Sequence, residues 1–371
     1  MSFNGGGLFL INSTGQPVVA GTLITASVFN ALTADLAQGL SNCITKDGQQ
    51  VVTADIPMGG FRLTGLGLGI NSTDATRMDN ANVYAMCEGR LSGTSGTPVT
   101  TADVTAIETL YFNPYKGSNI ALYDIALGVW RKYSIPQAGA SIDIPDATAV
   151  YDVFAGASGS SVALSLVAWT NDTTRAVGLS LTNGVITNGT GELRYLGTMY
   201  ATTAGNGQTE DSVANRYIWN YYNRIPRPLR AIDTTSSWTY GDNINWRQAR
   251  ATGTNALNFV VGIAEDPVDV QVMTTVQCTG SPGANSGSVA VGYDSTTTPT
   301  AGQIRVTPTG TVTNSTNTIT SRLLHFPAVG RHAYNWLELG AGGGAPVITF
   351  LSTASATGSQ GQAGIHGIVF G

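Results

Sequence analysis

The chain has 371 residues, of which 42% are hydrophobic and 11% are charged, and its net charge is −5. The hydrophobic share excludes a chain that is disordered by composition, and the charged share is less than half of the usual value of about 25%. The negative balance gives no general attraction to nucleic acid, whose binding needs clustered lysine and arginine.

The polar surface must therefore consist mostly of threonine, serine, asparagine and glycine. Threonine is β-branched and suits strands, and the 46 glycines supply the turns between them. We therefore expect a mainly β fold, in which a short N-terminal helical docking region precedes two β-sandwich or jelly-roll-like domains. A surface so poor in charge also suits a subunit that buries much of its surface in an oligomer.

The first predicted element is a helix near the N-terminus, which Thr25 or Ser27 can cap. One apolar stripe, at spacings of three, four and four residues, is formed by Phe29, Leu32, Leu36 and Leu40. A single stripe on a short helix needs a partner surface. That surface is either another subunit or a docking site on the particle, and we expect these four residues to dock there. Packing within the helix's own small domain is the alternative.

The helix opens the first of three predicted domains, which comprise residues 1–90, 91–240 and 241–371. A second, weaker helix is predicted over residues 74–86, and residues 54–66 have the pattern of a strand or an extended connector. Residues 91–98 are rich in turn formers and mark the first boundary.

Short strands separated by turns are predicted from residue 99 to the end of the chain. Residues 156–160 and 182–184 have the composition of hairpin loops. The spacing of the strands fits a sandwich or a barrel in the middle domain and a second, jelly-roll-like set of strands after residue 241.

The three cysteines, Cys43, Cys87 and Cys278, fit no metal-binding spacing, and we expect reduced, mostly buried thiols. The N-terminus lacks the pattern of a signal peptide, and no apolar run approaches the length of about 20 residues that a membrane span needs. We therefore expect a product that is made in the cytoplasm of its host and is not inserted into a membrane.

Residues that could perform catalysis are few, and the common nucleophile, phosphate-loop and zinc-protease motifs are absent from the sequence. Two carboxylate pairs, at residues 210–211 and 265–266, could serve a glycosidase, but neighbours on a strand point to opposite faces. His325, His332 and His366 could bind a metal in a trimer, although ordinary hydrogen bonding is the simpler interpretation. We expect no catalytic, cofactor-binding or metal-binding residues, and no cofactor.

Tyr217, Trp219 and Tyr221 alternate along one predicted strand, among the arginines of residues 216–230. Alternation on one face is typical of a sandwich core, with the arginines making contacts between subunits. The alternatives are that the three rings stack on a glycan or, less in keeping with the charge, on single-stranded nucleic acid.

Three sets of residues together resemble bacteriophage tail-fibre and related virion appendage proteins. Residues 10–17, 21–24, 29–36 and 58–66 are similar to the N-terminal particle-attachment region of these proteins. Residues 111–117, 168–175 and 219–224 resemble a module common in phage and prophage fibres, and residues 330–332 and 364–367 resemble the distal domain that is often fused to it.

The resemblance implies a homotrimeric structural protein of the virion, without catalytic residues, that docks to the particle through its N-terminus. Its partners would be further copies of itself, other virion proteins of the portal, adaptor, tail or capsid, and possible host-surface glycans. If the chain is a tail fibre, receptor contact would reside after residue 241, in loops such as residues 279–288 and 294–302; the alternative is that these loops are only solvated turns. A capsid-bound head fibre or decoration protein is the first alternative, and a polysaccharide depolymerase tailspike is the second.

Overall fold

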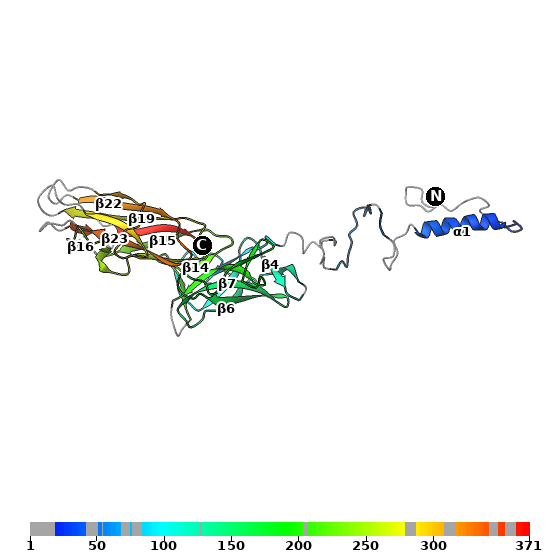
Figure 1. Ribbon diagram of the computed structural model, residues 1–371, viewed down its shortest axis with the longest axis horizontal. Helices are drawn as coiled ribbons and strands as arrows, with labels where there is room; N and C mark the ends of the chain where they lie inside the picture. The colour runs from blue at the N-terminus through cyan, green and yellow to red at the C-terminus, as the bar shows by residue number, and fades with distance from the viewer. Residues whose placement is uncertain are drawn as a thin grey trace. The chain divides into compact units, whose positions relative to one another are not determined.

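The computed structural model describes residues 19–41, 51–53, 55–67, 75, 84–126, 128–202, 207–278, 287–307, 316–340, 348–352 and 361–371. The chain divides into two compact units, Met1–Leu66 and Gly67–Gly371. The first contains the helix and the second contains the strands (Figure 1). The fold is mainly β with an N-terminal helix and several antiparallel sheets, which confirms the predicted fold class.

The first unit is built around α1 (Ala26–Ser41), which confirms the predicted helix. Thr25 caps its start, because its Oγ1 atom accepts a hydrogen bond from the backbone N–H of Val28 at 3.4 Å and its carbonyl accepts one from Phe29 at 3.1 Å. Residues 55–67 contain no helix or strand. This favours the extended connector over the strand among the two predictions for that segment.

The second unit begins with three sheets that share one core. A three-stranded sheet has the order β1-β3-β6 and a two-stranded sheet pairs β4 with β5; their bounds are Gly89–Ser92 (β1), Thr109–Pro114 (β3), Ala140–Asp143 (β6), Asn119–Asp124 (β4) and Val129–Ser134 (β5). A six-stranded sheet has the order β8-β7-β11-β10-β9 with β14 beside β11; its strands are β7 (Ala149–Ser158), β8 (Ser161–Ala168), β9 (Ser180–Thr182), β10 (Val185–Thr187), β11 (Arg194–Ala201) and β14 (Ile218–Asn220).

Two seven-stranded sheets follow. The first has the order β17-β23-β18-β13-β12-β2 with β20 beside β23; its strands are β2 (Val104–Ile107), β12 (Thr209–Asp211), β13 (Asn215–Arg216), β17 (Arg247–Gln248), β18 (Ala256–Val261), β20 (Ser288–Tyr293) and β23 (Gly330–Leu339). A short 3-10 helix, η1, spans Ala249–Ala251.

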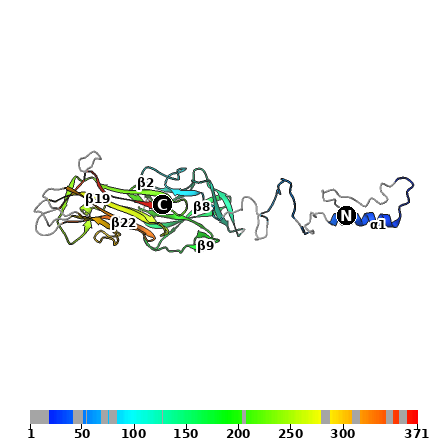
Figure 2. The same cartoon turned by 90° about the horizontal axis from the view of Figure 1, so that it is seen from above.

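The second of these, called the C-terminal sheet below, has the order β15-β25-β19-β22-β21, with β16 and β24 attached. Its strands are β15 (Pro226–Asp233), β16 (Ser237–Tyr240), β19 (Val268–Cys278), β21 (Ile304–Val306), β22 (Thr316–His325), β24 (Ile348–Leu351) and β25 (Ala363–Phe370). Figure 2 shows β19 and β22 side by side, as their antiparallel register requires.

The largest hydrophobic core lies between the two seven-stranded sheets. Val270 and Ile365 of the C-terminal sheet and Phe259 and Trp336 of the other sheet are fully buried in it. A separate core, with Leu110 among its members, is enclosed by the sheets of residues 87–218. Alternate residues of each strand point into these cores, which is why the strands have apolar and polar faces.

Strands from both predicted β domains share a sheet. β2, β12 and β13 belong to residues 91–240, yet they continue the sheet of β18 and β23, with β13 and β18 in parallel register. Arg90 adds a further link, since its guanidinium donates to the carbonyl oxygens of Asn223 and Gly371, both at 2.7 Å. These shared contacts do not decide where one domain ends and the next begins, so the boundaries at residues 90/91 and 240/241 stay predictions.

The two predicted hairpin loops join strands in the structure. Asn183 and Gly184 connect β9 to β10 with φ values of +53° and +80°, as a tight turn of primed type requires. β7 and β8 continue to Ser158 and Ser161, so the second loop is shorter than the predicted residues 156–160. The helix predicted over residues 74–86 falls mostly outside the described residues, and its last part, residues 84–86, is not helical.

Candidate functional site

The apolar stripe on α1 is open to solvent over most of its length. Phe29 is 56% exposed and Leu40 is 71% exposed; Leu36 is exposed as well, and Leu32 is half-buried. The helix carries a single charged residue, Asp35. The four residues that the sequence singled out therefore share one helix and offer a narrow apolar surface.

The three aromatic residues of the predicted glycan site occupy a different environment. Tyr217 and Trp219 are 6% and 3% exposed and belong to a core cluster with Phe154 and Tyr195, while Tyr221 is half-buried against that cluster. Two of the three rings thus have no open face for a sugar, and the packing is that of a sandwich core.

The arginines around this strand form ion pairs within the chain. Asp211 accepts from Arg216 at 2.8 Å and from Arg227 at 2.7 Å, and all three side chains are nearly buried. Arg224 pairs with Asp266 at 2.6 Å and lies over the ring of Trp219. Their charges are therefore balanced inside one subunit, although the sequence favoured contacts between subunits.

The paired carboxylates considered for a glycosidase take part in the same contacts. Asp211 is held between two arginines, and Glu210 accepts hydrogen bonds from Ser212 and Asn215. Glu265 and Asp266 both contact Arg224. These carboxylates are engaged in structural contacts, which fits a role in stabilising the fold.

Two of the three histidines form an aromatic cluster at the end of the core. His332 Nδ1 lies 2.7 Å from Asp294 Oδ2, and His325 Nδ1 lies 2.9 Å from the hydroxyl of Tyr334, with the ring of Tyr293 beside both histidines. Burial lowers the pKa of His325, and the nearby His332 lowers this pKa further. Within the described ranges, no three histidine, cysteine, aspartate or glutamate side chains could hold a metal ion.

Cys87 is the cysteine whose side chain lies in the described part of the chain. Cys87 is buried and free, and burial raises the pKa of its thiol to about 12, which disfavours the reactive thiolate. Cys43 and the side chain of Cys278 lie outside the described residues.

Of the two loops considered for receptor contact, residues 279–286 lie outside the described part of the chain. The loop of residues 294–302 is held by its own polar groups. Ser295 Oγ accepts from the N–H groups of Thr297 and Thr298, and Thr300 Oγ1 accepts from that of Tyr293. The loop is therefore a fixed turn that presents hydroxyl groups.

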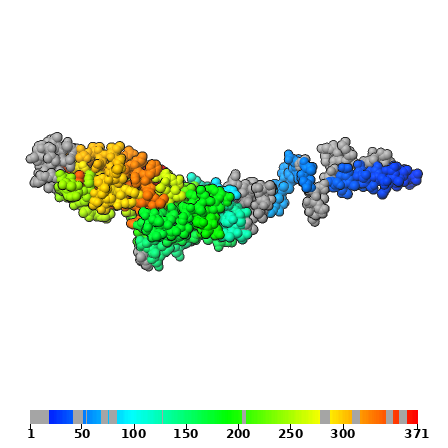
Figure 3. All heavy atoms as spheres, in the orientation of Figure 1, coloured from blue at the N-terminus to red at the C-terminus, as the bar shows by residue number. Residues whose placement is uncertain are grey.

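A second exposed apolar surface covers the side of the C-terminal sheet that faces away from the core. We call it the open face; its exposed apolar side chains are Met273, Ile304, Val306, Leu324, Ile368 and Phe370. In Figure 3 the yellow and orange atoms of this part of the chain lie at the surface of the second unit. Sequence analysis did not single out this face, because its apolar residues come from four strands far apart in the chain.

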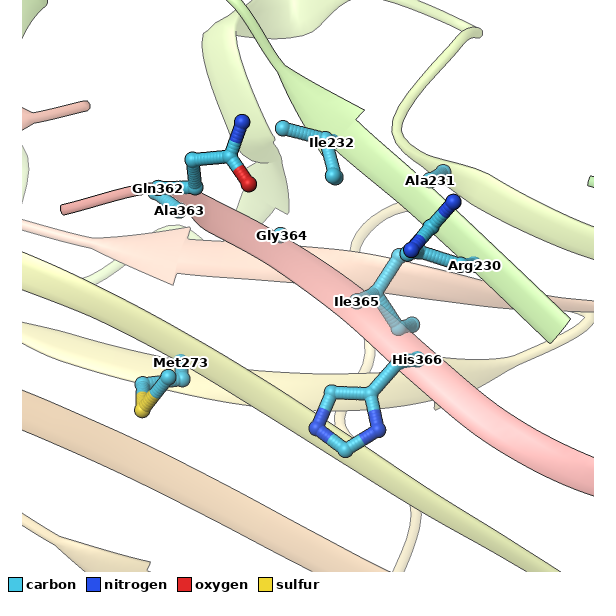
Figure 4. A pocket seen from close by; sticks show the side chains of 9 residues that line it. All are labelled: Arg230, Ala231, Ile232, Met273, Gln362, Ala363, Gly364, Ile365 and His366. Carbon is cyan, nitrogen blue, oxygen red and sulfur yellow. The ribbon is translucent and has the colours of Figure 1, made fainter. Parts of the chain in front are cut away.

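The open face contains a hollow where three strands meet. A pocket of about 340 Å³ is lined by Arg230 and Ile232 of β15, Gly364 and His366 of β25, and Met273 of β19. Figure 4 shows these side chains around Gly364, which has no side chain to fill the space. A substitution at Gly364 would also bring a Cβ atom within 2.5 Å of the carbonyl oxygen of Ala231.

Comparison with known proteins does not assign the chain to a family. No family model matches the sequence, and no curated protein matches it. None of the helices in the described part of the chain has the length and apolar character needed to cross a membrane.

Two solved structures show weak similarity. A structure of infectious bursal disease virus, Gt strain, is 10% identical, with 74% of this chain and 73% of that chain covered and a TM-score of 0.21. A Bacillus thuringiensis Cry1Da tryptic core variant is 9% identical, with 66% of this chain and 48% of that chain covered and a TM-score of 0.15. Both TM-scores are too low to support an argument about fold or function.

Proposed function

We propose that the chain is a structural subunit of a bacteriophage virion, an appendage of the tail-fibre kind in three copies. Its N-terminal unit docks to the particle, and its β-rich unit is presented outward. The observation that carries this proposal is the apolar stripe on α1, where Phe29, Leu36 and Leu40 remain exposed on an ordered, capped helix.

The energetics of the stripe support a docking role. Full burial of a leucine or phenylalanine side chain stabilises a complex by about 1.5–3 kcal/mol, so the exposed stripe can contribute several kcal/mol to binding. Asp35 is the only charge on the helix, so the complementary surface is apolar. A groove on a portal, adaptor, tail or capsid protein would suit such a helix, since i, i+3, i+4 and i+7 residues are its usual anchors.

The side chains of the second unit that could have served binding or catalysis take part in its internal packing and ion pairs. Arg216 and Arg227 are paired with Asp211 inside the unit, and the rings of Tyr217 and Trp219 belong to its core. The carboxylates that a depolymerase could use are engaged with Arg216, Arg224 and Arg227. These contacts support a structural function for the unit more than a catalytic one.

Host attachment is the outward role that we assign to residues 241–371. The fixed loop of residues 294–302 supports it, because hydroxyl groups on a rigid loop suit hydrogen bonding to sugars. The full-length chain, fluorescently labelled, should bind host cells, and competition with host-surface polysaccharide should reduce the binding. If the labelled chain does not bind cells, the attachment role fails and the head-fibre or decoration role is favoured.

Locating the chain on purified particles tests the proposal as a whole. We expect antibodies raised against the full chain to label the tail or its fibres in electron micrographs. Labelling of the capsid would favour the head-fibre or decoration alternative, and absence of the chain from particles would refute a virion role. Release of reducing ends from host polysaccharide by the purified chain would favour the depolymerase.

A further inference from the structure

The open face of the C-terminal sheet is unusual for the surface of a folded unit. Ile304 is 76% exposed and Leu324 is 67% exposed on the neighbouring strands β21 and β22, and Met273 of β19 and Ile368 of β25 are exposed as well. Single exposed apolar residues are ordinary, but exposed apolar residues on four neighbouring strands of one sheet face mark an interaction surface, even with polar residues between them.

The polar groups on this face require no charged partner. Arg322 donates two hydrogen bonds to Asp269, at 2.9 and 2.6 Å, so that this charge pair is satisfied within the chain. Gln271 lies opposite Arg322 in the register, and Thr320 lies opposite Met273. Apart from Arg230 and His366 at the hollow, the face is therefore neutral, with amide and hydroxyl groups that both donate and accept.

The dimensions of the face fit another folded surface. With neighbouring strands about 4.8 Å apart and about 3.3 Å per residue, the five strands from β15 to β21 have a footprint of roughly 600 Å². A standard protein interface buries about 800 Å² of solvent-accessible surface on each partner. Accessible surface follows the side chains, so it is larger than the flat footprint of the same face. A flat area of this size is too large for a small ligand and suits the sheet face of another protein.

The β15 edge of the sheet does not offer an equivalent route for association. Pro226 and Pro228 lie in the edge strand β15, and proline has no N–H group for a further strand. The N–H of Arg230 in the same strand is already bonded to the carbonyl oxygen of Val213 at 2.6 Å. A further strand is thus not expected to pair with β15.

We propose that the open face binds a second copy of this chain and forms the interface between subunits. A neutral face of apolar, amide and hydroxyl groups suits an equally uncharged surface of a neighbouring copy, and most soluble oligomers are built from identical chains around a closed symmetry. The hollow at Gly364 would receive an apolar side chain of the neighbouring copy. The inference rests on the oligomeric appendage proposed above, and it names the surface through which the copies meet.

The test uses the full chain with Met273→Asp and Ile304→Asp combined. Both side chains are exposed, so the double variant should fold, which thermal unfolding and circular dichroism will verify. Leu181→Asp is the matched control, because Leu181 is 73% exposed on β9, outside this sheet. We expect the wild type and the control to associate at micromolar concentration in sedimentation, and the double variant to weaken association at least 100-fold.

Three results would overturn the inference. The first is a wild-type chain that remains monomeric at micromolar concentration, the second is a folded double variant that associates as the wild type does, and the third concerns α1. Leu36→Asp on α1 separates this question from particle docking. If Leu36→Asp alone abolishes self-association, the copies meet through the helix and the open face is not their interface, whereas particle docking is measured separately by incorporation.

Discussion

α1 and residues 217–221, which include β14, each carry a line of large apolar side chains, but only one of the two lines packs into a core. On α1, Phe29 and Leu40 are more than half exposed. Trp219 on β14 is 3% exposed and belongs to a core cluster that also contains residues of β7, β11 and β18. β14 pairs with β11 inside a six-stranded sheet, and α1 belongs to a unit without strands among its described residues. An apolar line thus becomes core where other elements surround it and remains exposed where they do not.

The two faces of the C-terminal sheet repeat this contrast at shorter range. Val270 and Val272 point into the core and are fully buried, while Met273, the next residue along β19, is exposed on the open face. Neighbours on one strand differ in burial because one face of the sheet packs on the other seven-stranded sheet and the opposite face is exposed. The predictions below test each side of this contrast.

The largest effect is expected from truncating the buried line. Trp219→Ala should lower the free energy of unfolding of the second unit by about 3–5 kcal/mol, because it leaves a cavity in the core. Leu36→Ala on the open line of α1 should change it by less than about 0.5 kcal/mol. Urea denaturation followed by tryptophan fluorescence measures both variants. Similar losses of unfolding free energy for the two variants would mean that the line on α1 is as buried as the line around Trp219.

A somewhat smaller loss is expected from the buried ion pairs. Asp211→Asn should destabilise the fold by about 3 kcal/mol, because it leaves the charges of Arg216 and Arg227 uncompensated in a buried site. Asp269→Asn is the exposed counterpart, since its partner Arg322 is largely in solvent, and it should cost less than about 1 kcal/mol. Equal costs in denaturation experiments would mean that Asp211 is not effectively buried.

The sequence predicted local elements well, but it did not predict which distant strands lie side by side or which of their faces stay exposed. The spacing of Phe29, Leu32, Leu36 and Leu40 predicted α1, and Asn183-Gly184 predicted a hairpin, because both depend on residues close in the chain. The open face depends on Met273, Leu324 and Ile368 meeting across strands that are distant in sequence, and on which strand face the core leaves uncovered. No local pattern contains that information.

The smallest expected effect concerns pH. Burial lowers the pKa of His325 from its usual value of about 6.5, and His332 adds to this, although Asp294 opposes it. The folded protein therefore favours neutral His325, whose neighbours also include Tyr293 and Tyr334. Its contribution to stability is complete above about pH 6.5 and is lost as the pH falls through the lowered pKa of the folded state.

The variant His325→Gln should show a smaller loss of stability between about pH 7 and pH 5 than the wild type. Urea midpoints at several pH values in this range measure the slope for both proteins. His366→Gln is the control, because His366 is exposed on the open face. If His325→Gln keeps the slope of the wild type, another group causes the pH dependence.

The central claim is that the open line on α1 docks the chain to the virion, and incorporation into particles measures this most directly. Phage produced with the Leu36→Asp chain should lack the protein, because a charge buried without a partner costs several kcal/mol, on the order of the binding energy that the stripe contributes. Gln38→Asp, an exposed position of the same helix, should be incorporated as the wild type is. Particles that contain Leu36→Asp at the wild-type level, with the second unit folded, would contradict the claim.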